Sequence, residues 1–265
     1  MGQLFKTLKS AWSTGSDRNV SLLAAGTAYY AFLAMVPMMA VAVLGYGLLA
    51  DPETVARHAD RIAEALPPSA AGLVTDQLQS VIETETKAKG IGLFVSLLVA
   101  LFGARSGALA IITGMNIAFH AGEGRGFIKA NLLAMALTVA AVLGSGVIAG
   151  ATGLAAWLGA GIGGLLSFLV TAAAGFGGAC LLYRYVPNRP SPAWRGIRRG
   201  AALFAIGWTV ASSAFGFYAA NFGSYNATYG SLGAVVVLLT WLYLTAFLLL
   251  FGAFFAAAYH TEAQE

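Results

Sequence analysis

The stretch IGLFVSLLVALFGARSGALAIITGMNIAF, residues 91–119, decides how this chain folds. It has 29 residues, almost all apolar. As an α-helix at ~1.5 Å per residue it would reach roughly 43 Å, enough to cross a bilayer with tilt. Arg105 lies at its midpoint, with 14 residues before it and 14 after it. Because an ionised side chain at mid-bilayer costs at least ~2.5–3.5 kcal/mol on insertion scales, we expect groups inside the protein to receive Arg105.

The composition is that of a polytopic membrane protein. Of the 265 residues, 58% are hydrophobic and 10% are charged, whereas soluble domains carry about 25% charged residues. The formal net charge of +4 is too small to indicate nucleic-acid binding. The single cysteine, Cys180, cannot form an internal disulfide, and no metal or redox motif can be built on it. We expect no cofactor, no metal and no nucleic-acid partner.

Six apolar segments are long enough to cross the membrane, so the predicted fold class is all-α with six transmembrane helices in a single membrane domain, residues 1–265. Between the first and second spans, residues 51–89 hold seven acids and four bases. Their prolines and apolar spacing predict two short amphipathic helices that form an external cap. The predicted spans are residues 20–49, 91–119, 127–149, 162–183, 200–220 and 232–258.

The charges on alternate loops predict the orientation in the membrane. Residues 1–19 hold three bases, residues 120–129 hold two and residues 184–199 hold five. On the opposite side, residues 51–89 are net negative and the other two turns carry no charge. Since basic residues accumulate on the cytoplasmic side, both termini are predicted to be cytoplasmic.

The C-terminal half resembles a known family. The run YNATYGSLGA at 225–234 is specific, and it is accompanied by Trp194-Arg195, Trp208 and Trp241-Leu242-Tyr243. Upstream, AAGTAYYAFLAMVP at 24–37 fits the same pattern. Over nearly its whole length the chain resembles the YihY/BrkB family of bacterial inner-membrane proteins. The resemblance implies six spans and an inner-membrane location, and it suggests transport or lipid handling; members once carried the label ribonuclease BN, which is widely regarded as mistaken.

The last span departs from the family pattern. Family members commonly continue Gly-Ala-Glu-x-Asn, but Phe254 and Ala256 occupy the two polar positions here. A role of that glutamate therefore cannot be transferred to this chain.

Arg105 is the first candidate for a substrate-binding residue. No Asp or Glu occurs in the six predicted spans, so carbonyls, hydroxyls, amides, water or a bound anion must satisfy its guanidinium. Asn116 lies ~20° away around the helix and Thr113 lies nearby, which predicts a polar stripe. Three interpretations stay open: Arg105 locks the bundle by bonding carbonyls near Pro37, it binds a phosphate head group or small anion, or it snorkels to the surface.

Two other groups of residues are candidates for lipid contact. Tyr225, Asn226 and Tyr229 suit head-group or sugar binding on the outer side, although an aromatic belt with turn chemistry explains them equally simply. The arginines between the fourth and fifth spans could bind anionic phospholipid at the cytoplasmic leaflet, or could serve only as a topology signal. They are Arg184, Arg189, Arg195, Arg198 and Arg199.

The sequence gives little support for an enzyme. The acids lie mainly in one external loop, without metal-binding spacing, and neither a phosphate-binding loop nor a nucleophile elbow occurs. We therefore expect no ribonuclease activity. The prediction is an inner-membrane transporter or translocase-like protein for an anionic or amphipathic substrate such as a lipid head group, with membrane lipids as partners. The alternative is a non-transporting scaffold that organises envelope partners, and a homo-oligomer is compatible with both.

Overall fold

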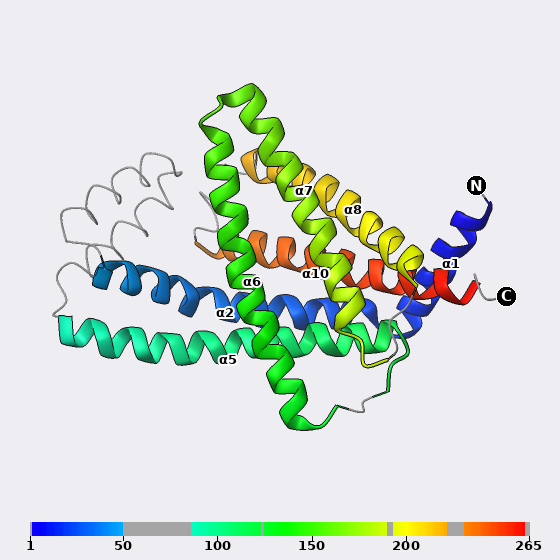
Figure 1. The fold of residues 1–265 in the computed structure, drawn as a ribbon, viewed down its shortest axis with the longest axis horizontal. Coiled ribbons are helices and arrows are strands. Elements are labelled where there is room, and N and C mark those ends of the chain that lie inside the picture. The colour runs from blue at the N-terminus through cyan, green and yellow to red at the C-terminus, as the bar shows by residue number, and fades with distance from the viewer. Residues whose placement is uncertain (1, 50–85, 123–124, 190–192, 222–230, 263–265) are drawn as a thin grey trace. The chain divides into compact units, whose positions relative to one another are not determined.

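A computed structural model of the chain describes residues 2–49, 86–122, 125–189, 193–221 and 231–262. All regular secondary structure within these residues is α-helical, as the apolar segments predict (Figure 1). The helices are α1 (Gly2–Asp17), α2 (Val20–Leu49), α5 (Thr86–Ala118), α6 (Phe127–Ala156), α7 (Ala160–Tyr185), α8 (Trp194–Asn221) and α10 (Ser231–Glu262).

The chain divides into two compact units. One unit, Leu33–Ala104, contains the C-terminal part of α2 and the N-terminal part of α5. The other unit, Met1–Phe32 with Arg105–Glu265, contains the remaining parts of these two helices together with α1, α6, α7, α8 and α10. Arg105 and every contact discussed below belong to this second unit.

Four helices within the described residues are long and apolar enough to cross a membrane, and Val20–Ala34 is a shorter apolar helix. The chain is therefore a multi-pass candidate by length and composition, while six spans stay a prediction. The four stretches are Phe127–Ala155, Gly161–Tyr185, Trp194–Tyr218 and Val235–Tyr259.

The helix bounds correct several predicted boundaries. Helix α2 has the predicted bounds, but α6 continues past residue 149 to Ala156 and removes most of the turn expected at 150–161. Helix α8 begins at Trp194 instead of residue 200. Arginine is a good helix former, so the helix continues through the charged residues that precede the apolar segment. Arg195, Arg198 and Arg199 are thus helical residues, not loop residues.

The predicted external cap can be compared with the structure only at its end. Residues 50–85 lie outside the described residues, whereas residues 86–89 belong to the beginning of α5 instead of the cap. The second predicted span therefore begins five residues earlier than the apolar run. Lys87 and Lys89 form part of its first turn, and a polar first turn is compatible with a helix that emerges from the hydrocarbon.

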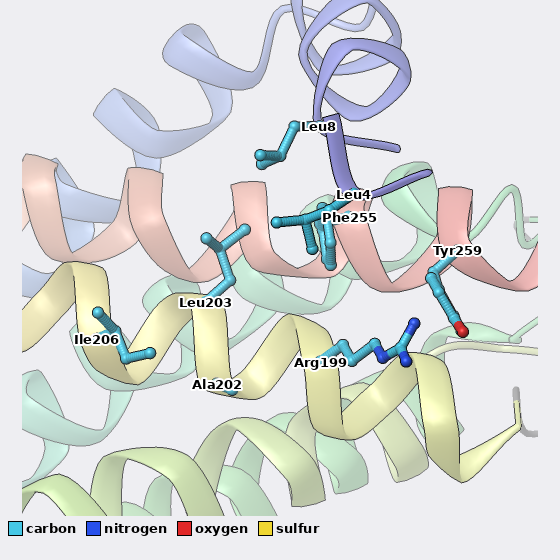
Figure 2. Close-up of a pocket in the computed structure, with 8 residues that line it drawn as sticks. All are labelled: Leu4, Leu8, Arg199, Ala202, Leu203, Ile206, Phe255 and Tyr259. Atoms are coloured by element: carbon cyan, nitrogen blue, oxygen red, sulfur yellow. The ribbon is translucent and has the colours of Figure 1, made fainter. Parts of the chain in front are cut away.

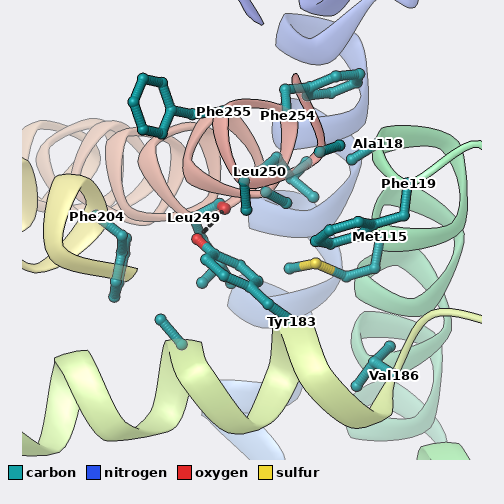
Figure 3. Packing of buried hydrophobic residues seen from close by; sticks show 14 of the residues in the cluster. Met115, Ala118, Phe119, Tyr183, Val186, Phe204, Leu249, Leu250, Phe254 and Phe255 are labelled. Carbon is teal, nitrogen blue, oxygen red and sulfur yellow. Dashed lines mark hydrogen bonds between the residues drawn. The ribbon is translucent and has the colours of Figure 1, made fainter. Parts of the chain in front are cut away.

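Large apolar side chains from α5, α7 and α10 form the centre of the core (Figure 3). Met115, Phe119, Tyr183 and Leu250 are each at most 1% exposed. The Tyr183 hydroxyl donates a hydrogen bond to the carbonyl oxygen of Leu249 at 2.7 Å, so the one polar atom of this aromatic side chain is satisfied. The phenol therefore joins α7 to α10 inside an otherwise apolar core.

Small residues allow α8 and α10 to pack closely. A Cβ atom on Gly200 would collide with the carbonyl oxygen of Gly252, and a Cβ atom on Gly196 would lie 2.8 Å from that of Ala256. This close approach is typical of small residues at four-residue spacing in membrane helices. Phe254 and Ala256 are 1% and 0% exposed and belong to this core.

Candidate functional site

Arg105 contacts an uncharged hydrogen-bond acceptor on α6, the helix that follows α5 along the chain. Its Nε donates a hydrogen bond to Oδ1 of Asn131 on α6 at 2.6 Å. Nδ2 of Asn131 in turn donates to the carbonyl oxygen of Phe127 at 2.8 Å, and the guanidinium carbon lies 6.0 Å from the centre of the Phe127 ring. The Arg105 side chain is half-buried. An amide and an aromatic ring therefore orient the guanidinium.

The residues of the predicted polar stripe on α5 lie at different levels of the helix. Asn116 lies about 16 Å from Arg105 along the helix axis at 1.5 Å per residue. Its Oδ1 accepts a hydrogen bond from the backbone N–H of Asn188 at 2.9 Å. Thr113 is exposed. Asn116 therefore has a backbone partner near the C-terminal end of α5, and a role of the stripe in substrate binding stays a prediction.

Asn116 belongs to a polar network that joins the α5–α6 connection to the end of α7. Arg125 donates from its two terminal nitrogens to the carbonyl oxygens of Val186 at 2.6 Å and Pro187 at 3.3 Å. The Asn188 side chain donates to Gly122 at 3.2 Å, and Arg189 donates to the carbonyl oxygen of Phe119. These charge-assisted bonds satisfy backbone carbonyls beyond the helix ends. We interpret the network as structural.

His120 lies at the edge of this network. Its φ is 52°, a left-handed conformation two residues after the end of α5. Partial burial lowers the pKa of His120, and the positive charges of Arg18 and Arg189 lower it further. The histidine is consequently biased towards its neutral form, which removes a positive charge from a basic surface.

The five arginines predicted to contact lipid have different surroundings. The guanidinium carbon of Arg184 lies 5.3 Å from the ring centre of Trp194, and that of Arg199 lies 4.2 Å from that of Tyr259. Arg189 is part of the polar network described above. Arg195 and Arg198 lie on α8 and are exposed, as are Arg189 and Arg199, whereas Arg184 is half-buried. Aromatic partners at these distances make cation–π contacts, so Arg184 and Arg199 each contact an aromatic ring although Arg199 is exposed.

Tyr225, Asn226 and Tyr229 lie outside the described residues, and their proposed head-group contact stays a prediction. Sequence reasoning missed Asn131, Arg125 and Asn188. Asn131 could have been found, since it is an amide inside the third predicted span. Like Arg105, a polar side chain at that depth needs a hydrogen-bond partner within the protein. The sequence does not mark Arg125 and Asn188 in this way, because arginine and asparagine are common in ordinary loops.

Across the described ranges, no group of three or more His, Cys, Asp or Glu side chains could hold a metal ion. The expectation that the chain is not an enzyme remains a prediction.

Comparison with known proteins decides the family. The profile of the family Virulence factor BrkB matches residues 11–265. The chain belongs to the BrkB family. This confirms the resemblance seen in the apolar segments and in the run at 225–234.

The relatives of this BrkB-family chain include membrane proteins. A ribonuclease-like protein, YfkH, of Bacillus subtilis is 30% identical over 225 residues, which are 77% of each chain. A UPF0761 membrane protein of Tolumonas auensis is 28% identical over 66% of this chain and 59% of its own. Another from Alteromonas mediterranea is 28% identical over 91% of this chain and 83% of its own. No solved structure matches. The chain is thus a multi-pass membrane protein of the BrkB family.

Proposed function

We propose that this BrkB-family protein is a transporter or translocase-like protein of the bacterial inner membrane that handles an anionic or amphipathic substrate, such as a lipid head group. The observation that carries the proposal is the contact of Arg105 with Asn131, 2.6 Å long, between apolar α5 and apolar α6. A charged side chain within apolar membrane helices is costly, and such residues typically mark substrate pathways.

The chemistry of the pair supports an anionic substrate. A guanidinium stays charged at physiological pH and presents its N–H donors in a planar fork that suits phosphate and carboxylate groups. The Asn131 amide orients Nε without contributing a negative charge of its own. The Phe127 ring lies beside the guanidinium and gives it an apolar neighbour. A phosphate that approaches this pair would meet an oriented cation in surroundings of low polarity, where electrostatic attraction is strong.

The test uses purified protein reconstituted into vesicles with fluorescent phosphatidylglycerol. We expect transbilayer movement of this lipid by the parent, strong impairment in Arg105→Lys, which loses the planar fork, and loss in Arg105→Gln. Thr138→Val is the matched control, since Thr138 lies on α6 outside the pair and its hydroxyl donates to Ala134 of its own helix, and it should behave as the parent. Equal lipid movement in the parent and Arg105→Gln would contradict the proposal.

The scaffold alternative is favoured by a different aspect of the same contact. Asn131 bonds both Arg105 and the backbone of its own helix at Phe127, so a continuous chain of hydrogen bonds connects α5 to α6. Such a chain stabilises helix packing without any substrate. Under this alternative, Arg105→Gln lowers thermal stability, and neither the parent nor the variant binds or moves an anionic lipid.

We further propose that the chain has no ribonuclease activity, because its acids and histidines lack the spacing of a metal or acid–base centre. The name of YfkH describes that protein as ribonuclease-like. Highly purified protein should leave labelled RNA intact with Mg²⁺ or Mn²⁺ present. Cleavage that a single substitution in the chain abolishes would refute this.

A further inference from the structure

An apolar groove lies between α1, α8 and α10, and Arg105 is not among the residues that line it (Figure 2). Its volume is about 490 Å³. Leu4 of α1 and Leu203 and Ile206 of α8 contribute apolar walls, and Leu4 and Ile206 are 59% and 66% exposed. The groove therefore presents uncovered apolar surface to its surroundings.

Helix α1 is held firmly enough to serve as a wall of the groove. The Trp12 ring packs edge-on against Phe247 and Phe251 of α10, with ring centres 6.4 and 6.0 Å apart. Gly15, on the same helix, would bring a Cβ atom within ordinary contact of Phe254. Aromatic contacts of this kind fix the position of a surface helix. The groove is thus formed by three packed helices instead of by one exposed face.

The polar groups of the groove gather at one end. Figure 2 shows Arg199 and Tyr259 beside each other and Ile206 at the other end of the row. Arg199 and Ile206 are separated by about 10 Å along α8 at 1.5 Å per residue. The Arg199 guanidinium lies over the Tyr259 ring at 4.2 Å, which fixes its position. The groove is consequently amphipathic along its length.

This polar end lies at the boundary of two candidate membrane spans. Arg199 is near the start of Trp194–Tyr218, and Tyr259 is the last residue of Val235–Tyr259. These spans pack antiparallel, since Gly196 and Gly200 meet Ala256 and Gly252. The two polar residues therefore belong to the same membrane surface, and the apolar part of the groove extends towards the hydrocarbon.

We propose that this groove binds a phospholipid, with an acyl chain along Leu203 and Ile206 and the anionic phosphate on Arg199. The inference names the substrate class and rests on the proposed function in that respect. Charge complementarity selects this occupant, because Arg199 places a positive charge at the polar end of a groove whose other walls are mainly apolar. Arg199 also offers a bidentate fork to a phosphate.

The experiment measures lipid binding to the full-length protein in neutral detergent by native mass spectrometry. The probes are phosphatidylglycerol and phosphatidylcholine with identical acyl chains, and inorganic phosphate tests whether the head-group anion suffices alone. The variants are Arg199→Gln, Ile206→Trp, which fills the groove, and Arg198→Gln as a matched control outside it. A thermal melt of each variant confirms folding, and Ile206 is exposed enough to accept a larger side chain.

We expect the parent to bind phosphatidylglycerol at least tenfold more tightly than phosphatidylcholine. Arg199→Gln should remove this preference, Ile206→Trp should weaken both lipids, and Arg198→Gln should change binding less than twofold. Equal effects of Arg198→Gln and Arg199→Gln would overturn the inference in favour of a general basic surface. Binding of inorganic phosphate as tightly as the lipid, or occupation of the groove by a second copy of the chain, would overturn it too.

The same measurements separate this inference from the proposed function. If the parent binds phosphatidylglycerol through Arg199 but moves no lipid across vesicles, the transport proposal fails and the groove inference stands. If the parent moves lipid but binds both lipids equally, the groove inference fails and the transport proposal stands.

Discussion

At the scale of single residues, the chemistry of Arg105 predicts the kind of group that contacts it. The absence of acids from the predicted spans indicates that a neutral group or a bound anion receives the guanidinium. Asn131 is such a neutral group. The sequence shows Asn131 as an amide inside the third predicted span, but it could not pair Asn131 with Arg105, because the periodicity of one helix does not specify its neighbours. The sequence also does not indicate the partner of Asn116, a backbone N–H beyond α7.

The buried phenol of Tyr183 allows a direct test of the core. Tyr183→Phe should lower the free energy of unfolding by about 0.5–1.5 kcal/mol, the usual net contribution of one hydrogen bond, because it removes the bond to Leu249. Tyr185→Phe is the control, as Tyr185 is exposed on the same helix. Chemical unfolding in detergent measures both variants, and equal losses would contradict the assigned bond.

His120 predicts how stability depends on pH. Its folded-state pKa is lowered by partial burial, then by Arg18 and Arg189, so the unfolded chain binds more protons below about pH 6.5. Stability should therefore fall as the pH decreases through this value towards the folded pKa. His120→Asn tolerates the positive φ and should reduce the slope. Thermal melts of the parent and the variant between pH 7.5 and 5.5 test this, and identical slopes would exclude His120 as the cause.

At the scale of secondary-structure elements, the close packing of α8 on α10 depends on glycine. Gly200→Val should destabilise the protein by about 1–3 kcal/mol or more through overpacking, because a side chain would collide with Gly252 and Ala256. Gly216→Ala on the same helix meets no atom within 4 Å and should be neutral or stabilise by up to ~1 kcal/mol. Melting temperatures in detergent distinguish the two, and a tolerant Gly200 would contradict the packing.

The elements also show what sequence can specify. Helix α2 was predicted with its observed bounds, since polar Asn19 and Asp51 delimit one apolar run. The start of α8 was predicted six residues late, because hydropathy reports depth in the membrane and not helicity. Helix α6 was predicted too short for a similar reason: Gly150 and Gly153 indicated a turn, yet glycine is common in membrane helices. The groove at α1 could not be predicted at all, as it arises from the packing of three separate helices.

At the scale of the whole molecule, six spans with both termini cytoplasmic remain the predicted topology, motivated by the charges of alternate loops. Single cysteines in a Cys180→Ala background test it. Positions 76 and 226 should react with an impermeant thiol reagent from outside intact cells, and position 195 only after the inner side is opened. Reaction of position 195 from outside would reject the orientation.

The most direct test of the central claim is lipid movement by Asn131→Asp in reconstituted vesicles. A carboxylate at residue 131 keeps or strengthens the contact with Arg105 but neutralises its charge. If Arg105 serves an anionic substrate, Asn131→Asp should retain the parent's melting temperature and lose phosphatidylglycerol movement by at least tenfold, whereas Asn131→Gln should retain part of it. Unchanged movement in Asn131→Asp would show that the pair only holds the helices together, and would contradict the account.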